Sequence, residues 1–238
     1  VEYTCKLRKK GGIYSVQDLI DFSQLINGES VSGRTLEDFY NVIDGDTIIF
    51  LEEDLTLTAD SSKLILPIGY HNTKGFRHTF DGQGHTISGL VVPDRSTNSN
   101  VYNGDSGLFG YITKDGIVRN LTISGASNVK NATADGVGVL AAQNYGLIID
   151  CAILTSTLTI ENTSGNIHQF GFICGSSYGI ITNCHVKNCT LTADNNCMAG
   201  FIAGCASGKL LNCRSFNNTY KYDKLHLKKA NPFLLHFH

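Results

Sequence analysis

The residues best suited to catalysis lie in one short string, Asp81-Gly-Gln-Gly-His85. Glycoside hydrolysis needs two carboxyl groups about 5–10 Å apart. Within the repeats described below, the remaining carboxylates are Asp135, Asp150, Glu161 and Asp194, and Asp150 occupies a repeated turn position. Glycines with an aspartate also suit a tight turn, because glycine accepts positive φ and aspartate bonds its own main chain. We therefore interpret the string as a turn and predict no catalytic residue.

Two other groups of side chains could bind a metal ion. The eight cysteines include no Cys-x-x-Cys and no zinc-finger partner set. A cluster of carboxylates in the first part of the chain could supply oxygen ligands for calcium: Asp44, Asp46, Glu52, Glu53 and Asp54. Their spacing is not that of an EF-hand, and the nonapeptide calcium-binding repeat is missing. His-Glu-x-x-His, the zinc peptidase motif, is missing. The sequence predicts no metal and no cofactor.

The chain contains four repeats with a period of about 30 residues. Their first glycines are 31, 33 and 29 residues apart, and a second glycine follows eight or nine residues later. An apolar run comes next, then Asn or Asp, then Leu or Cys. The repeats begin with Gly107-Leu-Phe-Gly, Gly138-Val-Leu-Ala, Gly171-Phe-Ile-Cys and Gly200-Phe-Ile-Ala.

Short apolar runs broken by Gly and Asn at a fixed period predict a solenoid of β-coils, in which each strand pairs with its copy about 4.8 Å away. Equivalent residues should stack. We predict that the ladder Leu121, Cys151, Cys184 and Cys213 points inward, with a second, narrower ladder through Gly110, Ala141, Cys174 and Ala203. The cysteines should be mostly reduced, with Cys189 and Cys197 the most exposed.

The first part of the chain has a different pattern. Residues 15–28 and 35–45 each begin with a capping-box-like motif and are compatible with helices, whereas 47–51 and 55–58 read as strands. Twelve of the 21 acids lie in residues 1–60. We predict a helical cap over 1–46, β-helix coils over 47–219 and an atypical tail over 220–238, with about six coils in all.

Composition excludes several classes of protein. The 238 residues are 42% hydrophobic and 17% charged, which is too apolar for a disordered chain. The net charge of −2 gives no electrostatic case for nucleic acid. No apolar run approaches the roughly 20 residues of a membrane span. Residues 1–30 lack a signal-peptide pattern, so we expect any secretion signal to be missing from this sequence.

Several strings resemble the GLUG-type β-helix repeat family. They are Leu66-Pro-Ile-Gly69, Phe80-Asp-Gly-Gln-Gly-His-Thr-Ile-Ser-Gly-Leu90, Gly107-Leu-Phe-Gly, Val118-Arg-Asn-Leu-Thr-Ile123, Ile-Thr-Asn183-Cys and Leu-Leu-Asn212-Cys, with the lead Ser15-Val-Gln-Asp-Leu. The resemblance spans roughly residues 13–216. It implies a right-handed parallel β-helix of the kind found in secreted or surface-attached microbial proteins, including adhesin-like chains and non-catalytic parts of IgA-cleaving peptidases. The high cysteine content departs from the family.

Exposed aromatic and amide side chains are the remaining binding candidates. Tyr102, Tyr111, Tyr145 and Tyr178 lie near predicted coil corners, where aromatic rings and hydrogen-bonding groups suit sugars. The alternative is ordinary turn packing. Five glycosylation sequons begin at Asn120, Asn131, Asn162, Asn188 and Asn217, and they matter only in a host that glycosylates secreted proteins.

Together these patterns predict an all-β, non-catalytic module at the cell surface or secreted, adhesin-like or a spacer, that binds carbohydrate or a host surface protein. The alternative is a carbohydrate-active β-helix enzyme, either hydrolase or lyase. An enzyme should bring two or more carboxylates together in a groove on one face. A third interpretation is a fragment of a longer surface chain with no function of its own.

Overall fold

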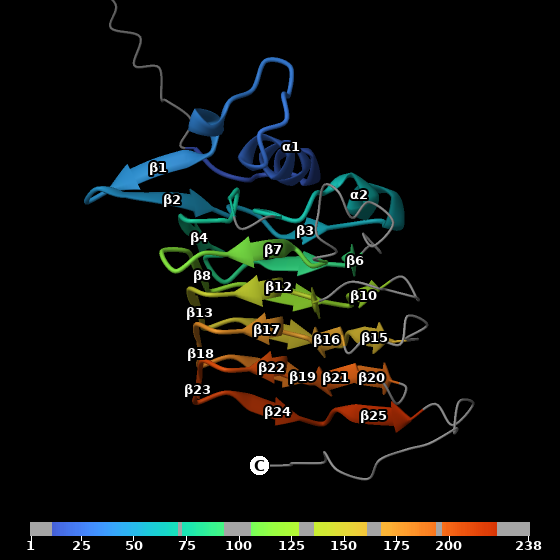
Figure 1. The fold of residues 1–238 in the computed structure, drawn as a ribbon. Helices are drawn as coiled ribbons and strands as arrows, with labels where there is room; N and C mark the ends of the chain where they lie inside the picture. The colour runs from blue at the N-terminus through green and yellow to red at the C-terminus, as the bar shows by residue number, and fades with distance from the viewer. Residues whose placement is uncertain are drawn as a thin grey trace, which may run out of the picture.

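The computed structural model describes residues 11–70, 73–92, 106–128, 136–160, 168–193 and 197–222. These residues form a parallel β-solenoid whose coils follow one another from the N-terminal end to the C-terminal end (Figure 1). The prediction of an all-β parallel β-helix with a short helical cap is therefore confirmed. In the middle of the solenoid a strand pairs with the strand one coil earlier and one coil later, as Ile148 does with Val118 and Ile181.

Two long sheets form the main walls. The first contains β1 (Tyr40–Ile43), β2 (Asp46–Phe50), β4 (Thr79–Asp81), β8 (Ile117–Arg119), β13 (Leu147–Ile149), β18 (Ile180–Thr182) and β23 (Lys209–Leu211). The second contains β3 (Leu55–Thr56), β5 (Thr86–Ser88), β9 (Thr122–Ser124), β14 (Ala152–Leu154), β19 (His185–Lys187) and β24 (Arg214–Phe216). Apart from the antiparallel β1, each wall of the described chain contains six parallel strands. About four turns of the solenoid are full coils.

Four smaller sheets complete the later coils. One contains β7 (Phe109–Ile112), β12 (Ala141–Asn144), β17 (Cys174–Ser177) and β22 (Ala203–Ala206). The others are β11 (Gly136–Gly138), β16 (His168–Gly171) and β21 (Cys197–Gly200); β15 (Thr157–Thr159), β20 (Thr190–Ala193) and β25 (Thr219–Tyr222); and β6 (Val91–Val92) with β10 (Ser127–Asn128).

The repeated glycines are required because backbone packs directly against backbone. A Cβ added to Gly171 would collide with the carbonyl oxygen of Cys174, where the chain reverses between β16 and β17. A Cβ on Gly179 would collide with the carbonyl oxygen of Gly146 in the preceding coil. The period seen in the sequence therefore reflects a steric requirement that returns at the same point of every coil.

The interior contains stacked side chains, among them a column of sulfur atoms. Leu121, Cys151 and Cys184 are each 1% exposed, and Cys213 is half-buried in the last described coil. The Cys184 thiol donates to the Thr182 carbonyl at 3.3 Å. Its hydrogen bond with Cys151, together with burial, raises the pKa of Cys184 to about 12, so the group stays a neutral thiol. None of the seven cysteines in the described residues is in a disulfide bond.

Two expectations about the interior were wrong. Cys189 is 1% exposed, because it directly follows the turn at Asn188 and its side chain points inward. The narrow ladder through Ala141, Cys174 and Ala203 continues to Phe109 and not to Gly110. Coil corners differ in length, so counting from one glycine to the next misplaces the register by one residue.

Left-handed backbone at two corners of each coil explains the repeated asparagines. At the first corner Asn120, Asp150, Asn183 and Asn212 have φ between 52° and 54°. The second corner is formed by Gly89, Gly125, Thr155, Asn188 and Asn217, with φ between 47° and 74°. Asn and Asp adopt this conformation at lower cost than other non-glycine residues. The predicted turn position of the Asn/Asp ladder is confirmed.

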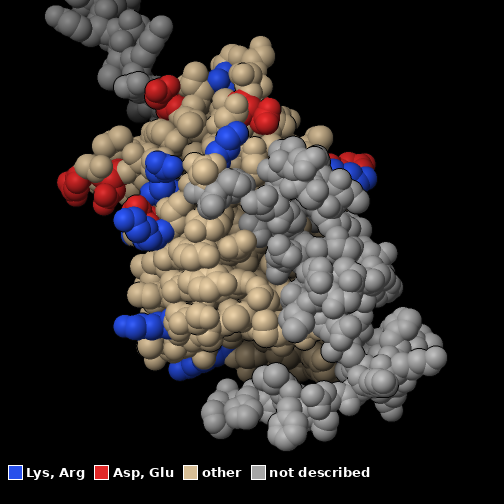
Figure 2. All heavy atoms as spheres, in the orientation of Figure 1, with Lys and Arg blue, Asp and Glu red and all other residues tan. Residues whose placement is uncertain are grey.

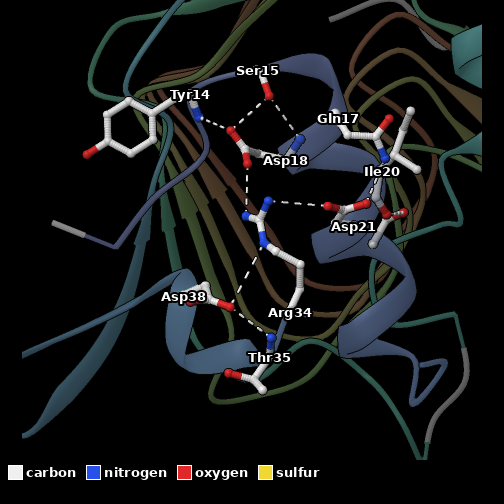
Figure 3. A network of polar contacts seen from close by, with 10 residues as sticks. Tyr14, Ser15, Gln17, Asp18, Ile20, Asp21, Arg34, Thr35 and Asp38 are labelled. Carbon is white, nitrogen blue, oxygen red and sulfur yellow. Dashed lines mark hydrogen bonds and ion pairs between the residues drawn. The ribbon is translucent and has the colours of Figure 1, made fainter. Parts of the chain in front are cut away.

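The N-terminal end is covered by α1 (Val16–Ile26), which begins at the predicted N-cap Ser15. The Asp18 carboxylate accepts from the Ser15 hydroxyl at 2.9 Å and from the Tyr14 N–H at 3.1 Å. Arg34 reaches Asp18 at 2.9 Å and Asp21 at 3.3 Å, tying the following loop to the helix (Figure 3). Leu19 and Phe22 of the same helix are fully buried.

The second predicted helix is replaced by a hairpin. Only a 3-10 turn, η1 (Leu36–Asp38), forms there, and β1 and β2 then pair in antiparallel register. Asp44 and Gly45 between them both have positive φ, at 53° and 91°, which is the requirement of a type I′ turn. A further short helix, α2 (Ala59–Leu64), was not predicted.

Candidate functional site

A column of three tyrosines lies at the corner between the β7–β12–β17–β22 sheet and the first wall. Tyr145 and Tyr178 directly follow β12 and β17, and Tyr111 belongs to β7. The corner is tight because buried Asn144 accepts from the Gly146 N–H at 3.0 Å and donates to the Ser177 hydroxyl at 3.1 Å. With that turn fixed, the side chains of Tyr145 and Tyr178 extend outward.

The three rings stack along the solenoid axis. The ring centroids of Tyr111 and Tyr145 are 4.8 Å apart with 21° between planes, and those of Tyr145 and Tyr178 are 4.7 Å apart with 17°. This spacing equals the distance between neighbouring strands, so the coil repeat itself sets the stacking. We call Tyr111, Tyr145 and Tyr178 the tyrosine ladder.

Stacking occupies most of the ring faces that a sugar could use. Tyr145 has a ring on each side, and Gly75 lies so close to Tyr111 that an added Cβ would be 2.7 Å from its ring. Among the described residues no other ring stacks on Tyr178, whose exposed fraction, 47%, exceeds the 37% of Tyr145. The next coil places exposed Ser207 at the equivalent corner position, so the ladder ends one ring short.

The surroundings of the ladder carry little charge. Residues 131–186 contain no Lys or Arg. Figure 2 shows the face over β7, β12, β17 and β22 as a continuous area without acidic or basic side chains. Burial, followed by the neighbouring Tyr145 and Cys205, raises the pKa of the Tyr178 phenol. The hydroxyl is therefore protonated at neutral pH and can both donate and accept a hydrogen bond.

The other predicted site residues are dispersed. Tyr102, Asn131 and Asn162 lie outside the described residues. The amide of Asn120 donates to Asp81 at 3.0 Å, whereas Asn188 and Asn217 are exposed at left-handed corners. All three asparagines have left-handed backbone, and glycosylation at them stays a prediction.

The Asp81 string is a turn, as predicted. The Asp81 carboxylate accepts from the Gln83 N–H at 2.9 Å and from Arg119 at 2.8 Å, besides its bond with Asn120. It borders a shallow hollow that also includes Asp150, which is exposed. With Asp81 tied to an arginine, this hollow presents one carboxylate to solvent, whereas glycoside hydrolysis needs two.

His85 is paired elsewhere. Its Nδ1 lies 3.1 Å from Asp54, which also accepts from the Thr86 N–H at 2.8 Å. The Thr86 hydrogen bond, and then His85, lower the pKa of the Asp54 carboxyl. Within the described ranges, no three His, Cys, Asp or Glu side chains are grouped to hold a metal ion. In the same residues no helix is long and apolar enough to cross a membrane.

Comparisons with known proteins give distant relatives. No family model matches the chain. It is 32% identical over 139 residues to halomucin of Haloquadratum walsbyi, and the aligned region covers 57% of this chain and 1% of halomucin. It is 33% identical over 87 residues to a "Putative Gly-rich membrane protein" of Evansella cellulosilytica, covering 37% of this chain and 9% of that protein. The chain thus spans a small part of either relative.

Among solved structures, one match is that of a "putative immunoglobulin A1 protease" from Bacteroides ovatus. The TM-score is 0.45 at 12% sequence identity, over 94% of this chain and 82% of that one. The fold of the chain itself, with its coils in register, defines the class of protein as a parallel β-solenoid. Membership of the GLUG-type family remains a prediction from the repeat sequences.

Proposed function

We propose that the chain is a non-catalytic β-helix module of a secreted or cell-surface protein, adhesin-like in role, and that it binds carbohydrate at the end of the tyrosine ladder. The observation that carries this proposal is that, among the described residues, a ring stacks on one face of Tyr178 only, while the next coil places Ser207 at the equivalent position. Halomucin and the Gly-rich membrane protein, by their names, support a surface setting.

The proposed contact is a pyranose ring in the place that a fourth tyrosine would occupy. Such a ring presents C–H groups on its flatter face, and these pack on an aromatic ring while the sugar hydroxyls stay hydrated. The Tyr178 phenol and the Ser207 hydroxyl supply hydrogen-bonding partners beside it. The low charge of the region favours a neutral sugar over a charged one.

Affinity electrophoresis through gels that contain single polysaccharides tests the proposal. We expect wild-type protein to be retarded by at least one neutral polysaccharide, and Tyr178→Ala to bind about 2- to 10-fold more weakly, the usual range for one aromatic contact. Tyr220→Ala is the matched control, because Tyr220 is also 47% exposed but lies on β25.

A second variant separates ring stacking from folding. Ser207→Leu places an aliphatic side chain against the free face of Tyr178, at a position where two other coils carry tyrosine. It should weaken retardation without lowering the melting temperature. Retardation equal to wild type in both Tyr178→Ala and Ser207→Leu would contradict the proposed site.

The hydrolase alternative is tested in the same gels by assaying reducing ends. The exposed Asp150 beside Asp81 is the feature that favours it. New reducing ends that disappear in Asp150→Asn would replace the proposal with a catalytic function. Retardation without new ends supports a binding module.

A further inference from the structure

We propose that copies of this chain associate head to tail through the two ends of the solenoid. At the C-terminal end, β23 and β24 each have a partner strand on one side only within the described chain. Leu210 and Leu211 on β23 are 43% and 48% exposed. An edge strand with free N–H and C=O groups and exposed apolar side chains readily pairs with another strand.

The N-terminal end offers the opposite edge of the same sheet. Antiparallel β1 is the outermost strand there, and its Val42 and Ile43 are exposed. A groove runs beside β1, and its lining includes Asp18, Glu37 and Asp38 together with Arg34, so acids outnumber bases there. The edge strand, its apolar side chains and the acidic groove lie together at the end that α1 caps.

The two ends carry opposite charge. Residues 11–60 contain eleven acids and a single arginine, whereas residues 197–222 contain Lys209, Arg214 and Lys221 and no acid. Figure 2 shows red side chains gathered at the N-terminal end, with blue ones among them, and blue without red at the other end. Complementary charge steers association and disfavours head-to-head or tail-to-tail contacts.

These observations identify a second copy of the chain as the partner. β23 of one copy would pair with β1 of the next, which extends the first wall across the junction in antiparallel fashion. Lys209 and Arg214 would then meet the acidic end that includes Glu37 and Asp46. Because the two surfaces differ, the contact is heterologous, and without ring closure it produces a linear series of copies.

Sedimentation velocity of the 238-residue chain tests the association directly. We expect the mean sedimentation coefficient to rise with protein concentration, and this rise to shrink as salt increases from about 0.1 M to about 1 M, since the Debye length falls from about 10 Å to about 3 Å. A concentration-independent monomer would overturn the proposal; residues 223–238 or a further segment of chain would then be the better candidates to cover β23.

Charge reversal tests whether the two ends are the surfaces that meet. One variant changes exposed Lys209→Glu and Arg214→Glu at the tail; the other changes exposed Glu37→Lys and Asp46→Lys at the head. Each should be monomeric alone, with an unchanged circular dichroism spectrum, and mixing the two should restore association. If either variant still assembles alone, or the mixture remains monomeric, the head-to-tail contact is wrong.

Discussion

Thr155 has the least favourable backbone of any corner residue in the described chain. Its φ of 47° is rare for a β-branched side chain, and its counterparts in neighbouring coils are Gly125, Asn188 and Asn217. The strain of such a conformation is on the order of 1–2 kcal/mol. The hydroxyl of Thr155 lies 3.1 Å from the Ser124 hydroxyl, and this solvent-exposed contact offsets little of the cost.

Replacing this residue should therefore stabilise the fold. Thr155→Asn is expected to raise the free energy of unfolding by about 1 kcal/mol, measured by urea denaturation. The reverse change, Asn188→Thr, should lower it by a similar amount. A Thr155→Asn protein no more stable than wild type would show that the threonine makes a compensating contact.

The types of the residues predicted the left-handed corners of the coils better than they predicted the side-chain contacts between neighbouring coils. The repeated Asn/Asp position was recognised because few residues tolerate left-handed backbone. Stacking of Tyr111 on Tyr145 could not be predicted, since Tyr111 pairs along the strand with Gln143. The corner after β7 is two residues longer than the corner after β12, and this difference brings the Tyr111 ring beside Tyr145.

At the scale of single elements, the N-terminal cap depends on one carboxylate. Burial opposes the ionisation of Asp18, but hydrogen bonds from Arg34, Ser15 and the Tyr14 N–H outweigh it and lower the pKa of the Asp18 carboxyl. A carboxyl whose pKa is lower in the folded state stabilises the fold above its unfolded pKa, about 3.9. That contribution is lost as the pH falls through the lowered folded value.

Asp18→Asn should consequently destabilise the protein at pH 7 by about 1–2 kcal/mol, the usual cost of a lost helix cap and its hydrogen bonds. The gap to wild type should narrow as the pH falls below about 4, because the unfolded chain takes up a proton at this carboxyl before the folded protein does, and it should be smallest below the lowered folded pKa. Urea unfolding at both pH values measures this. Asp60→Asn is the control, because Asp60 is exposed in α2; an equal loss of stability in that variant would contradict a specific role for Asp18.

The same region shows where local patterns mislead. Residues 36–43 carry apolar side chains at helical spacing, yet they form η1 and β1. The Asp44-Gly45 pair suits the end of a helix, but it is also a strong hairpin signal. Pairing with β2 then decided the outcome, because Ile48 and Ile49 continue into the first wall.

At the scale of the whole molecule, each coil contacts chiefly the coil before and the coil after it. The coil that contains β13 has a neighbouring coil on both sides, and its Ile148 is fully buried. Leu210, at the equivalent position of the last described coil, is 43% exposed. In arrays of this kind the terminal repeats open first, since they have one neighbour instead of two.

Amide hydrogen exchange should follow that gradient. Peptides that contain β23 and β24 should exchange faster than those that contain β13 and β14, at protein concentrations low enough to keep the chain monomeric. Mass spectrometry of peptic fragments measures the difference. Uniform protection along the solenoid would mean that the last described coil is covered in the monomer.

The fold was predictable from the sequence because the period is a property of the whole chain and survives local ambiguity. Four copies of a glycine pair at spacings of 29 to 33 residues indicated a coil more firmly than any single strand signal could. The candidate site was predictable only as separate tyrosines. Its decisive feature is that no further ring stacks on Tyr178 within the described residues, and this depends on a serine at position 207 that no sequence pattern marks.

The hydrogen bonds between successive strands run along the solenoid axis, and this determines how the module would respond to mechanical tension. A force that pulls the two chain ends apart loads the terminal coil first, so strands detach one after another instead of shearing together. Coils of 29 to 33 residues each release roughly 100 Å of extended chain when they open. Placed between a cell and a surface, such a solenoid would lengthen stepwise under load and limit the peak force on its attachment.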